Sequence, residues 1–199
     1  MTSTDSTEDL TSLIKDGYLG LADVLEQLPA ERWDADSLCE GWRVREVVAH
    51  MTMPVRYDQE AFMAELQECG FDFTILSNKV AARDGRLPPS QLVSELRDET
   101  MHNWEPPGGG PEGALTHLVI HSLDITVPLG EPPASSAEAR RTVLDLLTTG
   151  GAHAHFGIEK IDERLEATDM DWGFGSGTVR RASSTDILLG LTGRRTSAG

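Results

Sequence analysis

The sequence Ala114-Leu-Thr-His117-Leu-Val-Ile-His121-Ser-Leu-Asp124 is the most informative part of this chain, and it lies in a helix predicted from about Glu112 to Thr126. Residues 114, 117, 121 and 124 follow at steps of three, four and three, which places them on one helical face. Leu118 and Ile125 border this face, so we expect it to point into a helix bundle. Burying a polar group without a partner costs roughly 2–7 kcal/mol. The two imidazoles and the carboxylate therefore need partners or a ligand.

A third histidine, His50, lies in Val47-Val-Ala-His50-Met51, on the apolar face of another predicted helix. Taken alone, it is typical of a satisfied core residue, and the pair His117 and His121 is equally typical of two hydrogen-bonded core histidines. Together the three could supply neutral nitrogen ligands from two helices. Three protein ligands with an open fourth position are typical of catalytic zinc, although nickel and ferrous iron accept the same ligands.

The sequence thus predicts a divalent metal, zinc first, at His50, His117 and His121. Asp124 is predicted to orient one of these imidazoles by accepting its free N–H. An ordinary salt bridge or a solvent-exposed carboxylate is the alternative for Asp124.

Hydrophobic periodicity predicts helices around this segment and a mainly α fold. The predicted helices span about 6–28, 43–67, 88–103 and 112–126, with a short helix or structured loop over 71–80. Pro54 predicts a kink one turn after His50, because a helix-interior proline removes the bond to the carbonyl four residues back. The last helix is predicted to be closed by Pro128 and Gly130. Four long helices with loops between them imply a four-helix bundle.

The chain changes character after residue 131. A fifth helix is predicted over about 135–154, a strand over 164–168, a glycine-rich hairpin over 171–180 and a short helix over 185–191. The last 45 residues are too few for a core of their own. We therefore predict a metal-binding bundle over 1–131 and, over 132–199, a small α/β appendage packed on it.

Composition excludes several functional classes. The 199 residues contain 17 Lys and Arg against 33 Asp and Glu, for a formal net charge of −16. This balance argues against nucleic acid and against an anionic membrane surface, because both attract basic proteins. The first ten residues show no basic and apolar signal pattern, and two cysteines cannot form a disulfide framework. These features predict a cytoplasmic protein.

Two segments resemble the signatures of the DinB-like superfamily, in its mycothiol-dependent maleylpyruvate isomerase family. The segment Leu38-Cys-Glu-Gly-Trp42-Arg-Val-Arg-Glu-Val-Val-Ala-His50-Met is similar to "CxGWxVRDxVAHL". The segment from His117 through His121-Ser-Leu-Asp124-Ile-Thr-Val-Pro-Leu-Gly130 is similar to "xxxHxxDIxxPLG". The resemblance implies a DinB-like four-helix bundle with a divalent metal at His50, His117 and His121 that holds the sulfur of a low-molecular-weight thiol.

The resemblance also implies two differences from the founding isomerase. That enzyme has a glutamate where this chain has His117, so the metal site here would be less anionic. It also has a larger C-terminal domain, of which this chain would keep a truncated version. Three neutral ligands leave the full charge on the metal, which favours capture of a thiolate.

We therefore predict a metal-dependent S-transferase or isomerase-like enzyme that activates a thiol, mycothiol first, toward an electrophilic small molecule. A non-catalytic metal-containing bundle with a binding or stress-associated role is the alternative, and a metal-free bundle that sequesters an apolar ligand is a third. Asn78 and Arg83 are candidate substrate-binding residues, and Cys39 is interpreted as a buried structural thiol. The sequence leaves a homodimer open.

Overall fold

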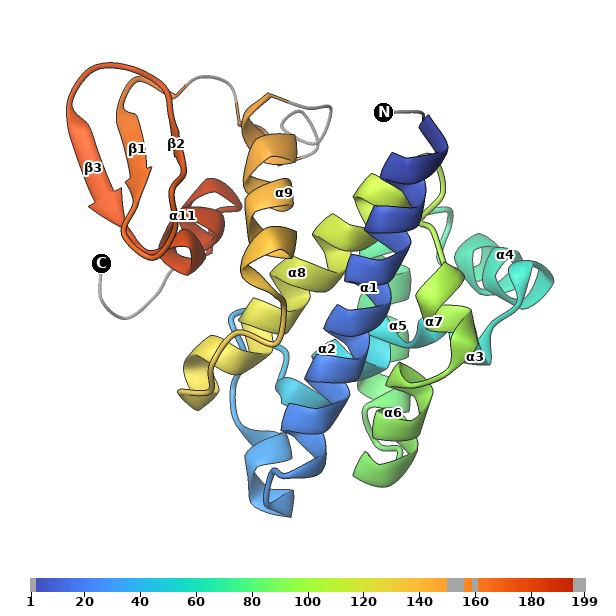
Figure 1. Ribbon diagram of the computed structural model, residues 1–199. Coiled ribbons are helices and arrows are strands. Elements are labelled where there is room, and N and C mark those ends of the chain that lie inside the picture. Colours follow the sequence, from blue (N-terminus) through green and yellow to red (C-terminus); the bar gives the residue numbers. More distant parts are fainter. Residues whose placement is uncertain (1–2, 150–155, 159–160, 195–199) are drawn as a thin grey trace.

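The computed structural model describes residues 3–149, 156–158 and 161–194. It is mainly helical, with one small sheet near the C-terminus, as the sequence predicts (Figure 1). The helices of the first 130 residues are α1 (Ser3–Glu26), a 3-10 turn (Ala30–Asp34), α2 (Val44–Met51), α3 (Met53–Arg56), α4 (Gln59–Glu68), α5 (Phe73–Asp84), α6 (Pro89–Leu96), α7 (Glu99–Asn103) and α8 (Gly110–Leu129).

Helix α8 is the central element of the bundle. It is apolar and buried around most of its circumference, which is typical of a helix enclosed by others. Helix α1 packs against it, and at their closest approach a Cβ on Gly17 would lie 2.6 Å from the side chain of Leu118. Helix α8 ends at Gly130, which adopts the left-handed conformation (φ 69°) that glycine accommodates without strain. The predicted stop at Pro128 is wrong, because this proline lies inside the last turn.

The single helix predicted over 43–67 is instead three helices. The chain leaves helical geometry at Thr52, where Pro54 occupies the first turn of α3, and again at Tyr57. Asp58 then starts α4, because its side chain accepts a hydrogen bond from the Ala61 N–H at 2.9 Å. The proline therefore starts a helix rather than kinking one.

The helix predicted over 88–103 is also divided. Helix α6 ends at Leu96, and Asp98 caps α7 by accepting a hydrogen bond from Thr100 N–H at 2.8 Å. An N-cap residue takes a non-helical backbone conformation, so the periodic apolar pattern cannot continue through it. After this break α7 packs against α1 and α3, and the loop that follows brings Trp104 beside His117 of α8.

The C-terminal elements are α9 (Ala137–Thr148), β1 (Arg164–Ala167), β2 (Gly173–Phe174), β3 (Val179–Ala182) and α11 (Ser184–Leu191). The predicted fifth helix extends to residue 154, but residues 150–155 lie outside the described part of the chain. The predicted hairpin is wrong: β1 is the middle strand, antiparallel to β2 and parallel to β3. Gly175 and Gly177 have positive φ and pass so close to the backbone of residues 162–163 that a Cβ would clash, which lets the chain cross β1.

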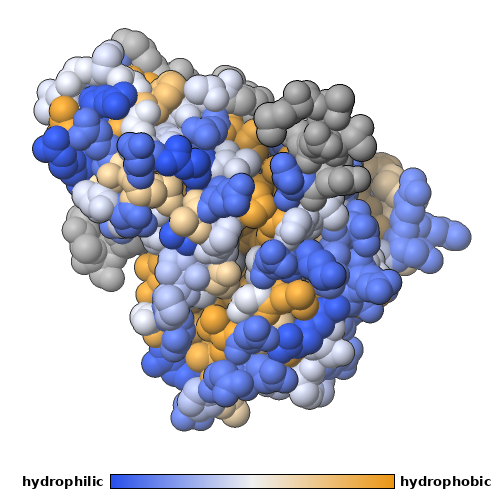
Figure 2. All heavy atoms as spheres, viewed as in Figure 1, coloured by the Kyte–Doolittle hydropathy of each residue, from blue (hydrophilic) through white to orange (hydrophobic). Residues whose placement is uncertain are grey.

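The C-terminal elements share the core of the bundle. Helix α9 packs on α8 and α1, and α11 packs on α9 and α8. Leu165, Ile187 and Leu188 are fully buried in the same apolar cluster as the bundle helices. The division at residue 131 stays a prediction. Hydrophilic side chains cover much of the face in Figure 2, with smaller apolar patches between them.

Candidate functional site

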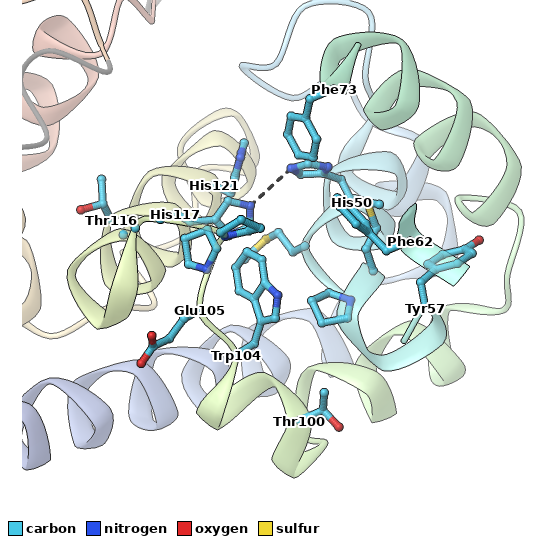
Figure 3. Close-up of a pocket in the computed structure, with 18 of the residues that line it drawn as sticks. His50, Tyr57, Phe62, Phe73, Thr100, Trp104, Glu105, Thr116, His117 and His121 are labelled. Carbon is cyan, nitrogen blue, oxygen red and sulfur yellow. Dashed lines mark hydrogen bonds between the residues drawn. The ribbon is translucent and has the colours of Figure 1, made fainter. Parts of the chain in front are cut away.

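Three histidines meet between α2 and α8, and we call them the imidazole cluster: His50, His117 and His121. The Nε2 atoms of His50 and His117 are 3.3 Å apart, and the ring centroids of His117 and His121 are 4.6 Å apart. One ring nitrogen from each residue lies within 4.8 Å of the others. Figure 3 shows that the three rings point toward one another from the two helices. The structure thus brings together the three residues predicted as ligands.

One nitrogen pair of the cluster has the separation expected in a tetrahedral metal site. Two nitrogen ligands about 2.0–2.1 Å from a tetrahedral ion lie roughly 3.3–3.4 Å apart. The separation of the His50 and His117 Nε2 atoms, 3.3 Å, matches this value. The donor set, three imidazoles and no carboxylate within the cluster, suits zinc and other borderline divalent metals.

Burial keeps two of these rings neutral. Burial, and then the neighbouring His121, lower the pKa of His50 to about 3. Burial, followed by His121, His50 and Arg194, lowers the pKa of His117 well below its ordinary value. A neutral imidazole keeps a lone pair, and a metal ligand requires that lone pair. His50 and His117 can therefore act as ligands at neutral pH without first losing a proton.

A hydrogen bond to Asp124 orients the third ring, that of His121. The Asp124 Oδ2 lies 3.0 Å from His121 Nδ1, so the other ring nitrogen of His121 is left for the cluster. Arg194 donates from Nε and Nη2 to the two oxygens of this carboxylate, each at 3.1 Å. Burial by itself would raise the pKa of Asp124, but the hydrogen bonds from His121 and Arg194 lower it to about 2. The carboxylate is charged and fully buried, in the orienting position that the sequence predicts.

Cys39 also contacts Asp124. Its thiol donates to Asp124 Oδ2 at 3.1 Å and lies 3.7 Å from His121 Nδ1. Burial, and then the Asp124 charge, raise the pKa of this thiol. Cys39, His121 and Asp124 form a second group with metal-ligand spacing, but Asp124 also carries two hydrogen bonds from Arg194. The protonated thiol as a hydrogen-bond donor is consistent with a structural role for Cys39.

The two predicted substrate-binding residues lie away from the cluster. Asn78 accepts a hydrogen bond from Trp42 Nε1 at 2.8 Å, and the Trp42 ring lies 5.1 Å from that of His50. Asn78 thus supports a side chain that packs against a cluster member. Arg83 bonds to Glu65 and Asp84 at 2.8 and 2.9 Å and does not line the cavity described next. Its role in substrate binding stays a prediction.

The imidazole cluster forms one end of a cavity of about 1440 Å³. Met51 lines it, whereas Trp42 and Leu118 do not. A second wall comes from α7 and the loop that follows, including Trp104, whose ring centroid is 5.3 Å from that of His117 (Figure 3). The sequence does not predict that this wall and Arg194 belong to the site, because only the tertiary fold brings them near the histidines.

Among the described residues, no helix is long and apolar enough to cross a membrane. The family model "Mycothiol maleylpyruvate isomerase N-terminal domain" matches residues 19–127, more than half of the chain. The comparison with curated proteins found no match.

Two solved structures share the fold. The crystal structure of the mycothiol-dependent maleylpyruvate isomerase aligns with a TM-score of 0.60 at 14% identity, over 99% of this chain and 94% of that chain. A mutant of that isomerase with a histidine replaced by alanine aligns with a TM-score of 0.53 at 16% identity, over 100% and 94% of the two chains. Because 94% of the isomerase chain has a counterpart here, the prediction of a truncated C-terminal part is wrong.

Proposed function

Since the chain belongs to the mycothiol maleylpyruvate isomerase N-terminal domain family, we propose that it binds a divalent metal ion and uses it to activate a low-molecular-weight thiol. Zinc is the first choice for the metal and mycothiol for the thiol. The activated thiol would add to an electrophilic small molecule. The observation that carries this proposal is the convergence of three imidazole nitrogens at the end of a cavity.

His50, His117 and His121 would hold the metal through neutral nitrogens. When bound, a divalent metal ion supplies a positive charge that stabilises a thiolate over a thiol, whose free pKa is about 8.5. Because the three imidazoles carry no charge, they leave that positive charge undiminished. Asp124 fixes the tautomer of His121 by accepting from Nδ1, and Arg194 holds Asp124 in place.

The size of the cavity supports the proposal that the thiol adds to a second, electrophilic molecule. Its volume of about 1440 Å³ exceeds the roughly 300–1,000 Å³ of ordinary ligand pockets, so a thiol and a second molecule fit together. Thr116 lines the cavity on the α8 side, and Trp104 faces His117 from the other side.

The test is thiol binding by metal-loaded protein. Calorimetry with mycothiol should give one binding site per chain, and the His50→Ala variant, which removes a ligand, should give none. The His102→Ala variant is the matched control, since His102 lies outside the cavity lining, and it should bind as the wild type does. Retained metal without thiol binding would contradict thiol activation and favour a non-catalytic metal-containing bundle.

A further inference from the structure

The walls of the cavity are aromatic close to the imidazole cluster. Trp104 lies on one side, 5.3 Å from the His117 ring, and Phe73 lies on the other, 6.2 Å from the His50 ring. Phe62 continues this surface outward, 6.5 Å from Phe73. Aromatic faces favour flat, apolar ligands. The rings of Phe73 and Trp104 thus flank the imidazole cluster on two sides (Figure 3).

The charges around the cavity are mostly negative. Four carboxylates line it: Asp58, Glu99, Glu105 and Glu112. Three of them lie at the N-termini of α4, α7 and α8. The partial positive charge of each helix N-terminus offsets at most roughly half of one negative charge. A net charge of about −2.5 therefore remains in the metal-free protein, and about −1.5 when a divalent metal ion and a thiolate are bound.

Apart from the metal ion, whose open position the thiolate sulfur would occupy, no cation is free to receive an anionic ligand in the described part of this lining. Arg194 is its one Lys or Arg residue, and its guanidinium is bonded to both oxygens of Asp124. Sites that recognise carboxylates usually present a free Arg fork. Maleylpyruvate has two carboxylate groups, so this cavity lacks the complement of such a molecule.

We propose that the electrophile of this protein is an uncharged aromatic molecule and that anionic electrophiles are disfavoured. This inference rests on the proposed function, because it names the substrate class of the same site. With a benzylic halide, the thiolate sulfur forms a bond to the benzylic carbon. The carbon–halogen bond breaks, the halide leaves with the electron pair, and the thiol proton passes to solvent.

The experiment compares two probes of similar reactivity, methyl 4-(bromomethyl)benzoate and 4-(bromomethyl)benzoate. Metal-loaded protein with mycothiol should conjugate the ester with a kcat/KM on the order of tenfold higher, after division by the uncatalysed rates. Added salt should reduce this preference, because it screens the carboxylates. The Glu105→Gln/Glu112→Gln variant should also reduce it, whereas the matched control Glu40→Gln/Glu138→Gln, outside the cavity, should retain it.

A second measurement separates this inference from the proposed function. The unreactive analogues methyl 4-methylbenzoate and 4-methylbenzoate are titrated by NMR against metal-free protein without thiol, so that no metal ion can bind the carboxylate. The ester should bind on the order of tenfold more tightly. Equal or tighter binding of the carboxylate, or its equal conjugation, would overturn the substrate class and leave thiol transfer intact. Loss of conjugation for both probes would refute thiol transfer, and the binding comparison would still decide the substrate class.

Discussion

Two clusters of polar side chains include residues six positions apart on α2 and α3. The polar groups of the two clusters differ in the partners that the fold gives them. We call the second the ion-pair cluster: Arg56, Tyr57, Asp84 and Glu95. Arg56 donates to Asp84 at 3.0 Å, to Glu95 and to Thr52 Oγ1 at 2.8 Å. The charged groups of the ion-pair cluster are therefore paired with one another.

The imidazole cluster is open by contrast. The Nδ1 atoms of His50 and His117 have no hydrogen-bond partner in the part of the chain that the structure describes, and their Nε2 atoms face each other. Of the ion-pair cluster, Tyr57 alone lines the cavity, whereas all three residues of the imidazole cluster line it. A buried polar cluster whose charges are paired within the fold is structural, whereas neutral ring nitrogens that converge beside a cavity form a candidate ligand site.

Removal of Arg56 should give the largest effect on stability. Arg56→Ala leaves two buried carboxylates, 8–9% exposed, without their main partner, and losing one member of a buried ion pair costs about 3–5 kcal/mol. Urea denaturation would measure this loss. The matched control is Arg97→Ala, whose partners Asp23 and Glu26 are exposed, and it should cost about 0–1 kcal/mol. Equal losses in the two variants would contradict the structural role of the ion-pair cluster.

Asp124→Asn should weaken metal binding rather than abolish it. The carboxylate that orients His121 is lost, and loss of such a partner reduces metal affinity about 10–100-fold. Competition with a zinc indicator would measure the affinity, and Asp23→Asn on the surface serves as the control. An unchanged zinc affinity would show that Asp124 serves packing alone.

A smaller effect concerns acid stability of the ion-pair cluster in metal-free protein. Burial by itself would raise the pKa of Asp84, but the hydrogen bonds from Tyr57 and Arg83 and the charge of Arg56 lower it. Its stabilising contribution is therefore complete above the ordinary aspartate pKa of about 3.9 and is lost as the pH falls through the lower value in the folded state. Between pH 5 and 3, urea unfolding of Asp84→Asn should lose less stability than that of the wild type. The surface variant Asp16→Asn should follow the wild type, and a wild-type slope in Asp84→Asn would refute this role.

Local sequence patterns account for much of the fold and for the histidines. The periodicity of residues 114, 117, 121 and 124 predicts one helical face, and the structure has that helix. Local patterns do not reveal where capping residues interrupt an apolar period, as Asp58 and Asp98 do. They also cannot show that Arg194 reaches Asp124, because that contact spans 70 residues and depends on the packing of α11.

The same limit explains the wrong hairpin prediction. A glycine-rich segment between two short strands usually indicates a tight turn. Here Gly175 and Gly177 serve close passage over the backbone of residues 162–163, so that β3 reaches the other edge of β1. Only the tertiary structure distinguishes a turn from such a crossing.

Zinc titration of chelator-treated protein tests the central claim most directly. The imidazole cluster should bind one zinc ion per chain, and each of His50→Ala, His117→Ala and His121→Ala should remove that binding while the fold is retained by circular dichroism. His102→Ala should bind one zinc ion as the wild type does. If the wild type binds no zinc, or if the three cluster variants bind it undiminished, the imidazole cluster is not a metal site.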